Sequence, residues 1–278
     1  MAQAGSAHSL FAWLVLAGVL ASLGAPEADA QWTRPSGDRM TITTVSLHRL
    51  DSASGRPDLI KEEVALYGEY GLTDAVTLTA RSAAQSLRHD GPVQRNIVVV
   101  DQKQAEILAP SEREFGIGGI ELGARVRLHR DGPWAISAQG VFGVPGSGEN
   151  QINARFGEGG GDIDLRLQVG RGFGGRGFVA ASGGWRDRRG ADPDEIRLDL
   201  VAGRPLGRGV HVFVQSYSVW SADDGPEARP GYSGHRAQAS IILPVARRMR
   251  LQVGALSTVQ SRDMAREQAV LVSLWRRF

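Results

Sequence analysis

The chain has no cysteine, few aromatic residues and almost no excess of one charge over the other. Without cysteine it holds no disulfide scaffold, no thiolate metal site and no thiol nucleophile. A formal net charge of +2 over 278 residues argues against nucleic acid as a partner, because nucleic-acid binders carry a concentrated basic face. Glycine, in contrast, is abundant at 36 residues, which is typical of turns and crowded strands and unfavourable for helices.

Long apolar runs are absent except near the N-terminus, where Leu10–Leu20 is uninterrupted. The following alanine-rich stretch ends in Ala-Asp-Ala at residues 28–30, the small-x-small pattern that signal peptidase cleaves. A transmembrane anchor is the alternative, but it needs about 20 apolar residues, and this run breaks at Pro26. No Lys or Arg precedes the run, which departs from the usual signal. We expect a signal peptide at residues 1–30 and a mature domain at residues 31–278.

Apolar and polar residues alternate through almost all of the mature chain. In Asp162–Val169, for example, Asp, Asp, Arg and Gln alternate with Ile, Leu, Leu and Val. This period of two gives a strand one apolar and one polar face. Breaks that contain Gly, Asp or Pro separate about twelve such segments. The segments are Met40–Leu50, Ile60–Tyr70, Ala75–Gln85, Phe115–Leu128, Trp134–Gly143, Asp162–Val169, Gly177–Arg186, Glu195–Ala202, Val210–Trp220, His235–Leu243, Met249–Thr258 and Arg266–Phe278.

The breaks alternate in length, as expected if short turns lie on the periplasmic side and longer loops outside. With the first strand starting in the periplasm, the periplasmic breaks are 71–74, 129–133, 170–176, 204–209 and 246–248. The external breaks are 51–58, 86–114, 145–160, 187–194 and 221–234, with a short exception at 260–263. The longest, Ser86–Glu114, has room to fold into the mouth of a barrel, and its portion Asp101–Leu108 is compatible with a short helix.

Aromatic residues fall near both ends of the expected strands, as the two membrane interfaces favour. Tyr70, Trp134, Phe178, Trp275 and Phe278 belong to the periplasmic end, and Phe142, Trp185 and Trp220 to the external end.

These patterns predict an all-β protein, a transmembrane antiparallel up-and-down β-barrel of about twelve strands. Hydrocarbon offers no hydrogen-bond partners, so a sheet spans a membrane only when its edges close on each other. We therefore expect a monomer in the outer membrane of a Gram-negative-type bacterium, with outer-membrane lipids around it.

The closing strand carries the expected insertion signal. Val270, Val272, Leu274 and Phe278 share one face, and a strand ending in Phe resembles the signal that the barrel-assembly machinery reads. Arg276 departs from that pattern, since the family usually has an apolar residue there. A long basic side chain at the interface can nevertheless reach headgroups or water.

The polar face of the strands supplies the candidate site, the lumen. Its charges have mixed signs, which favours pairing between strands and argues against a pore for polyanions. The lumen-facing candidates are Glu63, Glu69, Arg81, Glu121, Arg125, Arg127, Asp162, Asp164, Arg166, Arg197, Asp199, Arg236, Arg250 and Glu267.

Catalytic motifs are weak, so we expect no enzyme, no cofactor and no metal site. The glycines at 170–175 match a dinucleotide fingerprint, but the residues after them do not read as the helix which that site needs, and a hairpin turn is favoured. No His-x-Ser pair of the outer-membrane lipid hydrolases occurs. Asp223, Asp224 and His235 leave open a hydrolase at the external rim, which a solvated loop explains better.

One family resemblance rests on two segments. Tyr67–Leu78 reads Tyr-Gly-Glu-Tyr-Gly-Leu-Thr-Asp-Ala-Val-Thr-Leu, and Gly118–Leu128 reads Gly-Gly-Ile-Glu-Leu-Gly-Ala-Arg-Val-Arg-Leu. They resemble a hairpin and a strand of the outer-membrane barrels assigned to transport in the phenol-degradation meta-pathway (MetA-type), with Val76 and Gly119 departing from the pattern. The resemblance covers mainly residues 62–143. It implies passage of small solutes, aromatic or hydrophobic ones included, and carries over no binding residue.

The sequence thus leaves two main hypotheses. The first is an outer-membrane channel for small solutes whose identity is unknown. The second is a structural or surface-interaction barrel whose lumen is filled by its own side chains.

Overall fold

The structure, a computed structural model, describes residues 33–51, 58–91, 93–100, 103–109, 113–146, 161–189, 193–222 and 231–278. The expected signal peptide lies outside the described residues, as does the external pair Asp223 and Asp224.

Strands account for all the regular structure of the described ranges. They are β1 (Arg39–Leu50), β2 (Leu59–Thr73), β3 (Val76–His89), β4 (Val93–Val100), β5 (Lys103–Ala109), β6 (Glu114–Asp131), β7 (Trp134–Val144), β8 (Ile163–Gly172), β9 (Phe178–Asp187), β10 (Glu195–Gly207), β11 (Val210–Ser221), β12 (Ser233–Ala246), β13 (Met249–Arg262) and β14 (Glu267–Arg277). A search of the same residues for a helix long and apolar enough to cross a membrane finds none.

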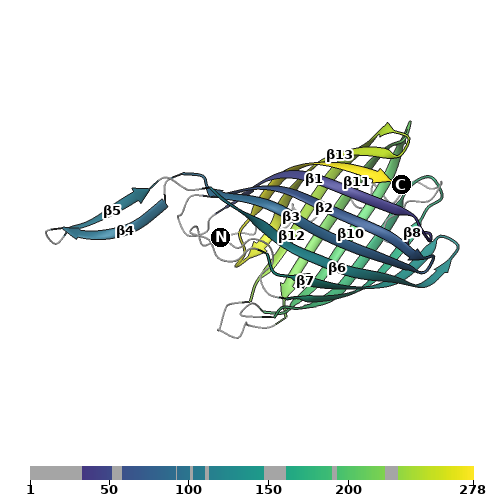
Figure 1. Ribbon diagram of the computed structural model, residues 1–278, viewed down its shortest axis with the longest axis horizontal. Helices are drawn as coiled ribbons and strands as arrows, with labels where there is room; N and C mark the ends of the chain where they lie inside the picture. Colours follow the sequence, from purple (N-terminus) through teal and green to yellow (C-terminus); the bar gives the residue numbers. More distant parts are fainter. Residues whose placement is uncertain are drawn as a thin grey trace, which may run out of the picture.

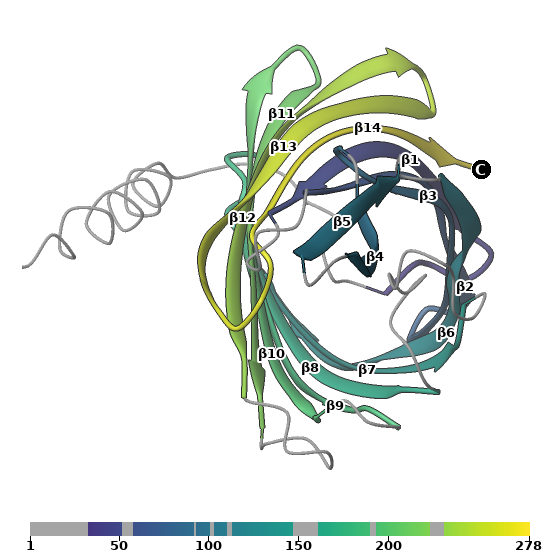
Figure 2. The same ribbon diagram turned by 90° about the vertical axis from the view of Figure 1, so that its left-hand side faces the viewer.

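Twelve of the strands form one closed antiparallel barrel, in the order β1-β14-β13-β12-β11-β10-β9-β8-β7-β6-β3-β2. Figure 2 shows this ring from the end at which the long connections lie. The first and last barrel strands close it, in a register that runs from Met40 opposite Arg277 to Leu50 opposite Glu267. The predicted fold class is confirmed, and closure leaves no strand edge unpaired, as a sheet in hydrocarbon requires.

The two ends of the barrel differ as the break lengths predicted. Tight turns join β2 to β3, β6 to β7 and β10 to β11, and the C-terminus lies at this end (Figure 1). In the β10–β11 turn, Gly207, Arg208 and Gly209 have φ values of 95°, 50° and 77°. Two of these three left-handed positions are glycine, which adopts them without a Cβ clash.

The long excursion between β3 and β6 holds a two-stranded sheet of its own, β4 with β5. Figure 1 shows this hairpin beyond the open end of the barrel, on the side opposite the C-terminus. The helix expected within Asp101–Leu108 is therefore wrong, because Lys103–Ala109 is strand β5. Its partners on β4 include three consecutive valines, Val98 to Val100, and β-branched residues of this kind favour strand pairing.

Burial is reversed relative to a soluble protein. The outer face carries exposed Val, Leu and Ile side chains, such as Val64, Leu165 and Val270, with 50%, 59% and 58% of their surface accessible. Polar side chains such as Glu69, Asp164 and Gln168 lie buried on the inner face. The apolar surface is satisfied only by lipid, where a Lys or Arg near the bilayer midplane would cost about 2–4 kcal/mol.

Candidate functional site

The inner wall of the barrel is the candidate site. Because side chains alternate along each strand, register alone decides which residues point inward. The fourteen charged residues assigned to the lumen from the sequence all occupy inward positions at or beside a barrel strand: Glu63, Glu69, Arg81, Glu121, Arg125, Arg127, Asp162, Asp164, Arg166, Arg197, Asp199, Arg236, Arg250 and Glu267. Most of them fall into four ion-paired groups, and Arg127 and Arg250 lie outside these groups.

The first group surrounds Glu267, at the external end of β14. Its Oε2 accepts a hydrogen bond from Nη1 of Arg236 at 2.7 Å, and its Oε1 is 3.9 Å from Nζ of Lys61. Lys61 in turn lies 3.5 Å from Oε2 of Glu63, and Arg81 bridges Glu63 and Glu121. The group thus runs along the wall from β12 to β6 and ties both sides of the β1–β14 closure.

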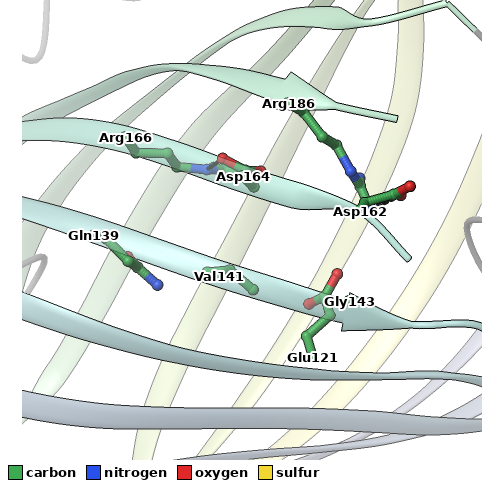
Figure 3. A pocket seen from close by; sticks show the side chains of 8 residues that line it. All are labelled: Glu121, Gln139, Val141, Gly143, Asp162, Asp164, Arg166 and Arg186. Atoms are coloured by element: carbon green, nitrogen blue, oxygen red, sulfur yellow. Dashed lines mark hydrogen bonds and ion pairs between the residues drawn. The ribbon is translucent and has the colours of Figure 1, made fainter. Parts of the chain in front are cut away.

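A second group and a neighbouring pair lie on or beside β8, β9 and β10, where Asp162, Asp164, Arg166 and Arg186 line a cavity of about 180 Å³. Asp164 on β8 accepts from Nη2 of Arg166 at 2.6 Å and faces Nη1 of Arg197 at 3.3 Å. Beside them, Arg186 on β9 lies 2.9 Å from Oδ2 of Asp162. Figure 3 shows Asp162, Asp164, Arg166 and Arg186 around the cavity, with Glu121 and Gln139 on its other side.

The periplasmic end holds another deeply buried group. Oε2 of Glu69 accepts from Nε of Arg34 at 2.7 Å, and its Oε1 accepts from Tyr67 at 2.7 Å and from Arg125 at 3.2 Å. Side chains of Arg34, Glu69 and Arg125 are 5%, 6% and 8% exposed, so these charges are shielded from solvent.

Arg34 reaches this site from a short segment before β1, residues 33–38, that folds against the periplasmic turn. Its backbone N–H donates to Oγ1 of Thr77 at 2.7 Å, and the Thr33 hydroxyl donates to the carbonyl of Asp74 at 2.9 Å. Gly71 permits the approach, because a Cβ there would overlap the carbonyl oxygen of Pro35. The segment therefore narrows the periplasmic mouth. Because it is not a strand, alternation in the sequence does not predict this docking.

Three aromatic side chains also line the lumen near the periplasmic end. The ring of Phe213 on β11 meets Phe178 edge-on at 5.3 Å between centroids and Trp275 at 6.3 Å. Nε1 of Trp275 donates to Gln252 at 2.9 Å, and a Cβ at Gly203 would overlap the Phe178 ring.

The aromatic girdle expected from the sequence is therefore partly wrong. Phe178 and Trp275 occupy inward positions, because they share strand faces with Ser182 and Ser273. Position along a strand places a residue near an interface, but only its parity decides between lipid and lumen. That parity signal is present in the sequence and would have identified the pair. Of the others, Tyr70, Trp134, Phe142, Trp185 and Phe278 are exposed on the outer face.

At the external rim, Tyr232 joins two connections. Its hydroxyl donates to Oε1 of Glu195 at 2.6 Å, and Nη1 of Arg188 lies 2.9 Å from the same oxygen. Burial, followed by the hydrogen bond to the Glu195 carboxylate, raises the pKa of Tyr232, so its hydroxyl remains a donor.

The dinucleotide-like glycines and the rim-hydrolase candidates do not form a site in the described part of the chain. The glycines at 170–175 lie at the end of β8 and in the turn to β9, a hairpin and not a strand-to-helix turn. His235 lies on the outer face against Trp220, and the acidic pair proposed with it lies outside the described residues. Among the described residues, no group of three or more His, Asp or Glu side chains is arranged to hold a metal ion.

Comparison with known proteins places the fold. No family model matches the chain, and no curated protein matches it either. Among solved structures, an outer-membrane channel of the COG4313 group from Pseudomonas putida F1 is 13% identical, with a TM-score of 0.68 over 91% of this chain and 100% of that one. The NanC porin is 7% identical, with a TM-score of 0.53 over 84% of this chain and 98% of that one. The translocator domain of the autotransporter NalP from Neisseria meningitidis is 12% identical, with a TM-score of 0.50 over 98% and 97%. At these identities the likeness shows the fold alone, so the chain has the fold of a Gram-negative outer-membrane barrel.

Proposed function

We propose that this protein is an outer-membrane channel through which small solutes, aromatic ones included, pass along the lumen. One observation carries the proposal: the lumen ion pairs between strands follow the wall. Arg125 on β6 reaches Glu69 on β2, and Arg236 on β12 reaches Glu267 on β14. Each pair spans two positions of the ring. Charges paired in this way stabilise the wall without linking its opposite sides.

The similarity in fold to a Pseudomonas outer-membrane channel and to a porin supports the same function. Mixed charge signs favour small neutral or weakly charged solutes over polyanions, because pores selective for polyanions are lined mainly by Arg or Lys. The alternative is a barrel whose lumen side chains serve structure alone.

The three lumenal aromatics support an aromatic solute in particular. An aromatic ring interacts favourably with a second ring at a centroid distance of about 4.5–7 Å, and such a pair contributes roughly 0.5–1.5 kcal/mol beyond the buried area. That energy corresponds to a roughly two- to twelvefold preference over a saturated ring. Phe213 and Trp275, which are partly accessible, offer such edges and faces at the periplasmic half of the lumen, and the buried Phe178 ring packs against Phe213.

Planar-bilayer recording and liposome swelling with the refolded protein test the proposal. We expect single-channel steps, and benzoate entering faster than cyclohexanecarboxylate, which has similar size and the same charge. Gly203→Ala should reduce this preference by displacing the Phe178 ring, whereas Gly183→Ala should not, because a Cβ at Gly183 meets nothing within 4 Å. Absence of conductance and of solute flux would refute the channel and favour the structural barrel.

A further inference from the structure

A serine, a histidine and a glutamate form a hydrogen-bonded chain on the lumen wall where β1 meets β14. Ser46 and His48 are two residues apart on β1, so both side chains point inward. Glu267 begins the neighbouring strand β14. Oγ of Ser46 lies 2.8 Å from Nε2 of His48, and Nδ1 of His48 lies 2.6 Å from Oε1 of Glu267. Both distances are those of well-formed hydrogen bonds.

The carboxylate determines what the histidine can do. With Glu267 accepting at Nδ1, the neutral ring carries its proton there, and Nε2 is left to accept from the serine hydroxyl. Arg236 holds the other carboxylate oxygen at 2.7 Å, which fixes the orientation of Glu267. Base, orienting acid and hydroxyl therefore have the order and spacing that activate a serine nucleophile.

The surroundings suit a small acyl group. Opposite Ser46 and His48 on β14 lie Leu271 and Ala269, which give the site an apolar side. On β2, Lys61 lies opposite His48 and Glu63 lies opposite Ser46, and the Lys61 ammonium is 3.5 Å from Glu63 and 3.9 Å from Glu267. A cation at this place can stabilise the negative oxygen that develops when an acyl carbonyl is attacked.

We propose that Ser46, His48 and Glu267 form a nucleophilic triad that hydrolyses small carboxylic esters inside the lumen. Oγ of Ser46 bonds to the carbonyl carbon while its proton passes to Nε2 of His48. The ester C–O bond then breaks, and the alcohol leaves with that proton. Water hydrolyses the acyl-serine, releasing the carboxylic acid and restoring the serine. Glu267 acts as a positioning residue.

This activity goes beyond a channel, and it requires only that a small ester reach the lumen from either mouth. A search for His-x-Ser misses the site because the serine precedes the histidine here. On a strand either order brings the two side chains to one face, since the spacing of two residues is the same.

Covalent labelling of the full chain, folded in detergent micelles, tests the proposal. Diisopropyl fluorophosphate should add to Ser46, forming the Oγ–P bond with loss of fluoride, and mass spectrometry should locate the adduct. The Ser46→Ala and His48→Gln variants should abolish this labelling. Ser218→Ala is the matched control variant, and it should leave the labelling unchanged. Ser218 contacts Nδ1 of His235 at 3.0 Å, but no described carboxylate contacts that histidine.

Hydrolysis of p-nitrophenyl acetate gives the second readout. The wild-type protein should hydrolyse this ester faster than Ser46→Ala does. Glu267→Gln should lower kcat at least roughly tenfold while KM changes little, because the orienting carboxylate acts through the histidine. Heat-modifiable migration in gels verifies that each variant is folded. If Glu267→Gln does not fold, the comparison of wild type with Ser46→Ala decides.

Labelling that is absent from Ser46, that is equal on Ser46 and Ser218, or that persists in His48→Gln would overturn the triad. Conductance recorded from the same preparation separates the two proposals. Conductance without labelling would support the channel and refute the triad. Labelling without conductance would support the triad and refute the channel.

Discussion

The buried carboxylate at the periplasmic mouth gives the sharpest test of the lumen as a desolvated site. We predict that Glu69→Gln destabilises the barrel strongly although it preserves the shape of the side chain. The amide keeps an acceptor for Tyr67 but removes the negative charge between the guanidinium groups of Arg34 and Arg125.

The magnitude follows from burial. All three charged side chains are less than 10% exposed, so the substitution leaves two shielded cations without their common anion. Removing one partner of a buried ion pair costs about 3–5 kcal/mol. The folded-to-unfolded ratio should therefore fall by roughly two to three and a half orders of magnitude.

Urea unfolding of the refolded protein in detergent micelles, followed by heat-modifiable migration, measures this loss. Glu62→Gln on the same strand is the matched control: its carboxylate pairs with Arg113 at 3.2 Å, but the two side chains are 42% and 45% exposed. Such a surface pair contributes about 0–1 kcal/mol. If Glu69→Gln costs no more than Glu62→Gln, the periplasmic mouth is well solvated and the reasoning fails.

Two further predictions concern the mouth and the closing strand. Gly71→Ala should prevent the segment at residues 33–38 from docking and should raise single-channel conductance. Gly68→Ala should not, because a Cβ at Gly68 meets its nearest neighbour at 4.0 Å. Equal conductance in both variants would contradict a narrowing role for the segment. Phe278→Ala should lower the fraction of protein assembled in the outer membrane of expressing cells, as the insertion-signal hypothesis requires. It should not reduce the stability of the folded barrel, because Phe278 is 49% exposed on the outer face. Unchanged assembly would remove that hypothesis.

The barrel itself was accessible from sequence because its information is local. Alternation in a segment such as Asp162–Val169 states which face meets lipid, and β8 forms there with Leu165 exposed and Asp164 buried. Break lengths likewise separated the end with the tight turns from the end with the long connections. The sequence allows a short helix within Asp101–Leu108, where the structure has strand β5, because a short segment outside the alternating barrel strands lacks that local constraint.

The contacts inside the lumen depend on which strands become neighbours. Arg125 and Glu69 are 56 residues apart, and His48 and Glu267 are 219 apart, so no local spacing could pair them. The docking of Arg34 likewise depends on a segment outside the strands.

The sequence by itself determined a closed antiparallel barrel with a polar interior, because strand period and the cost of an open edge in hydrocarbon leave few alternatives. Only the tertiary structure decided which lumen charges meet, how the mouth is narrowed and where Ser46, His48 and Glu267 come together. Closure of the ring brings the first and last barrel strands side by side, and the contact of His48 with Glu267 exists only because of that closure.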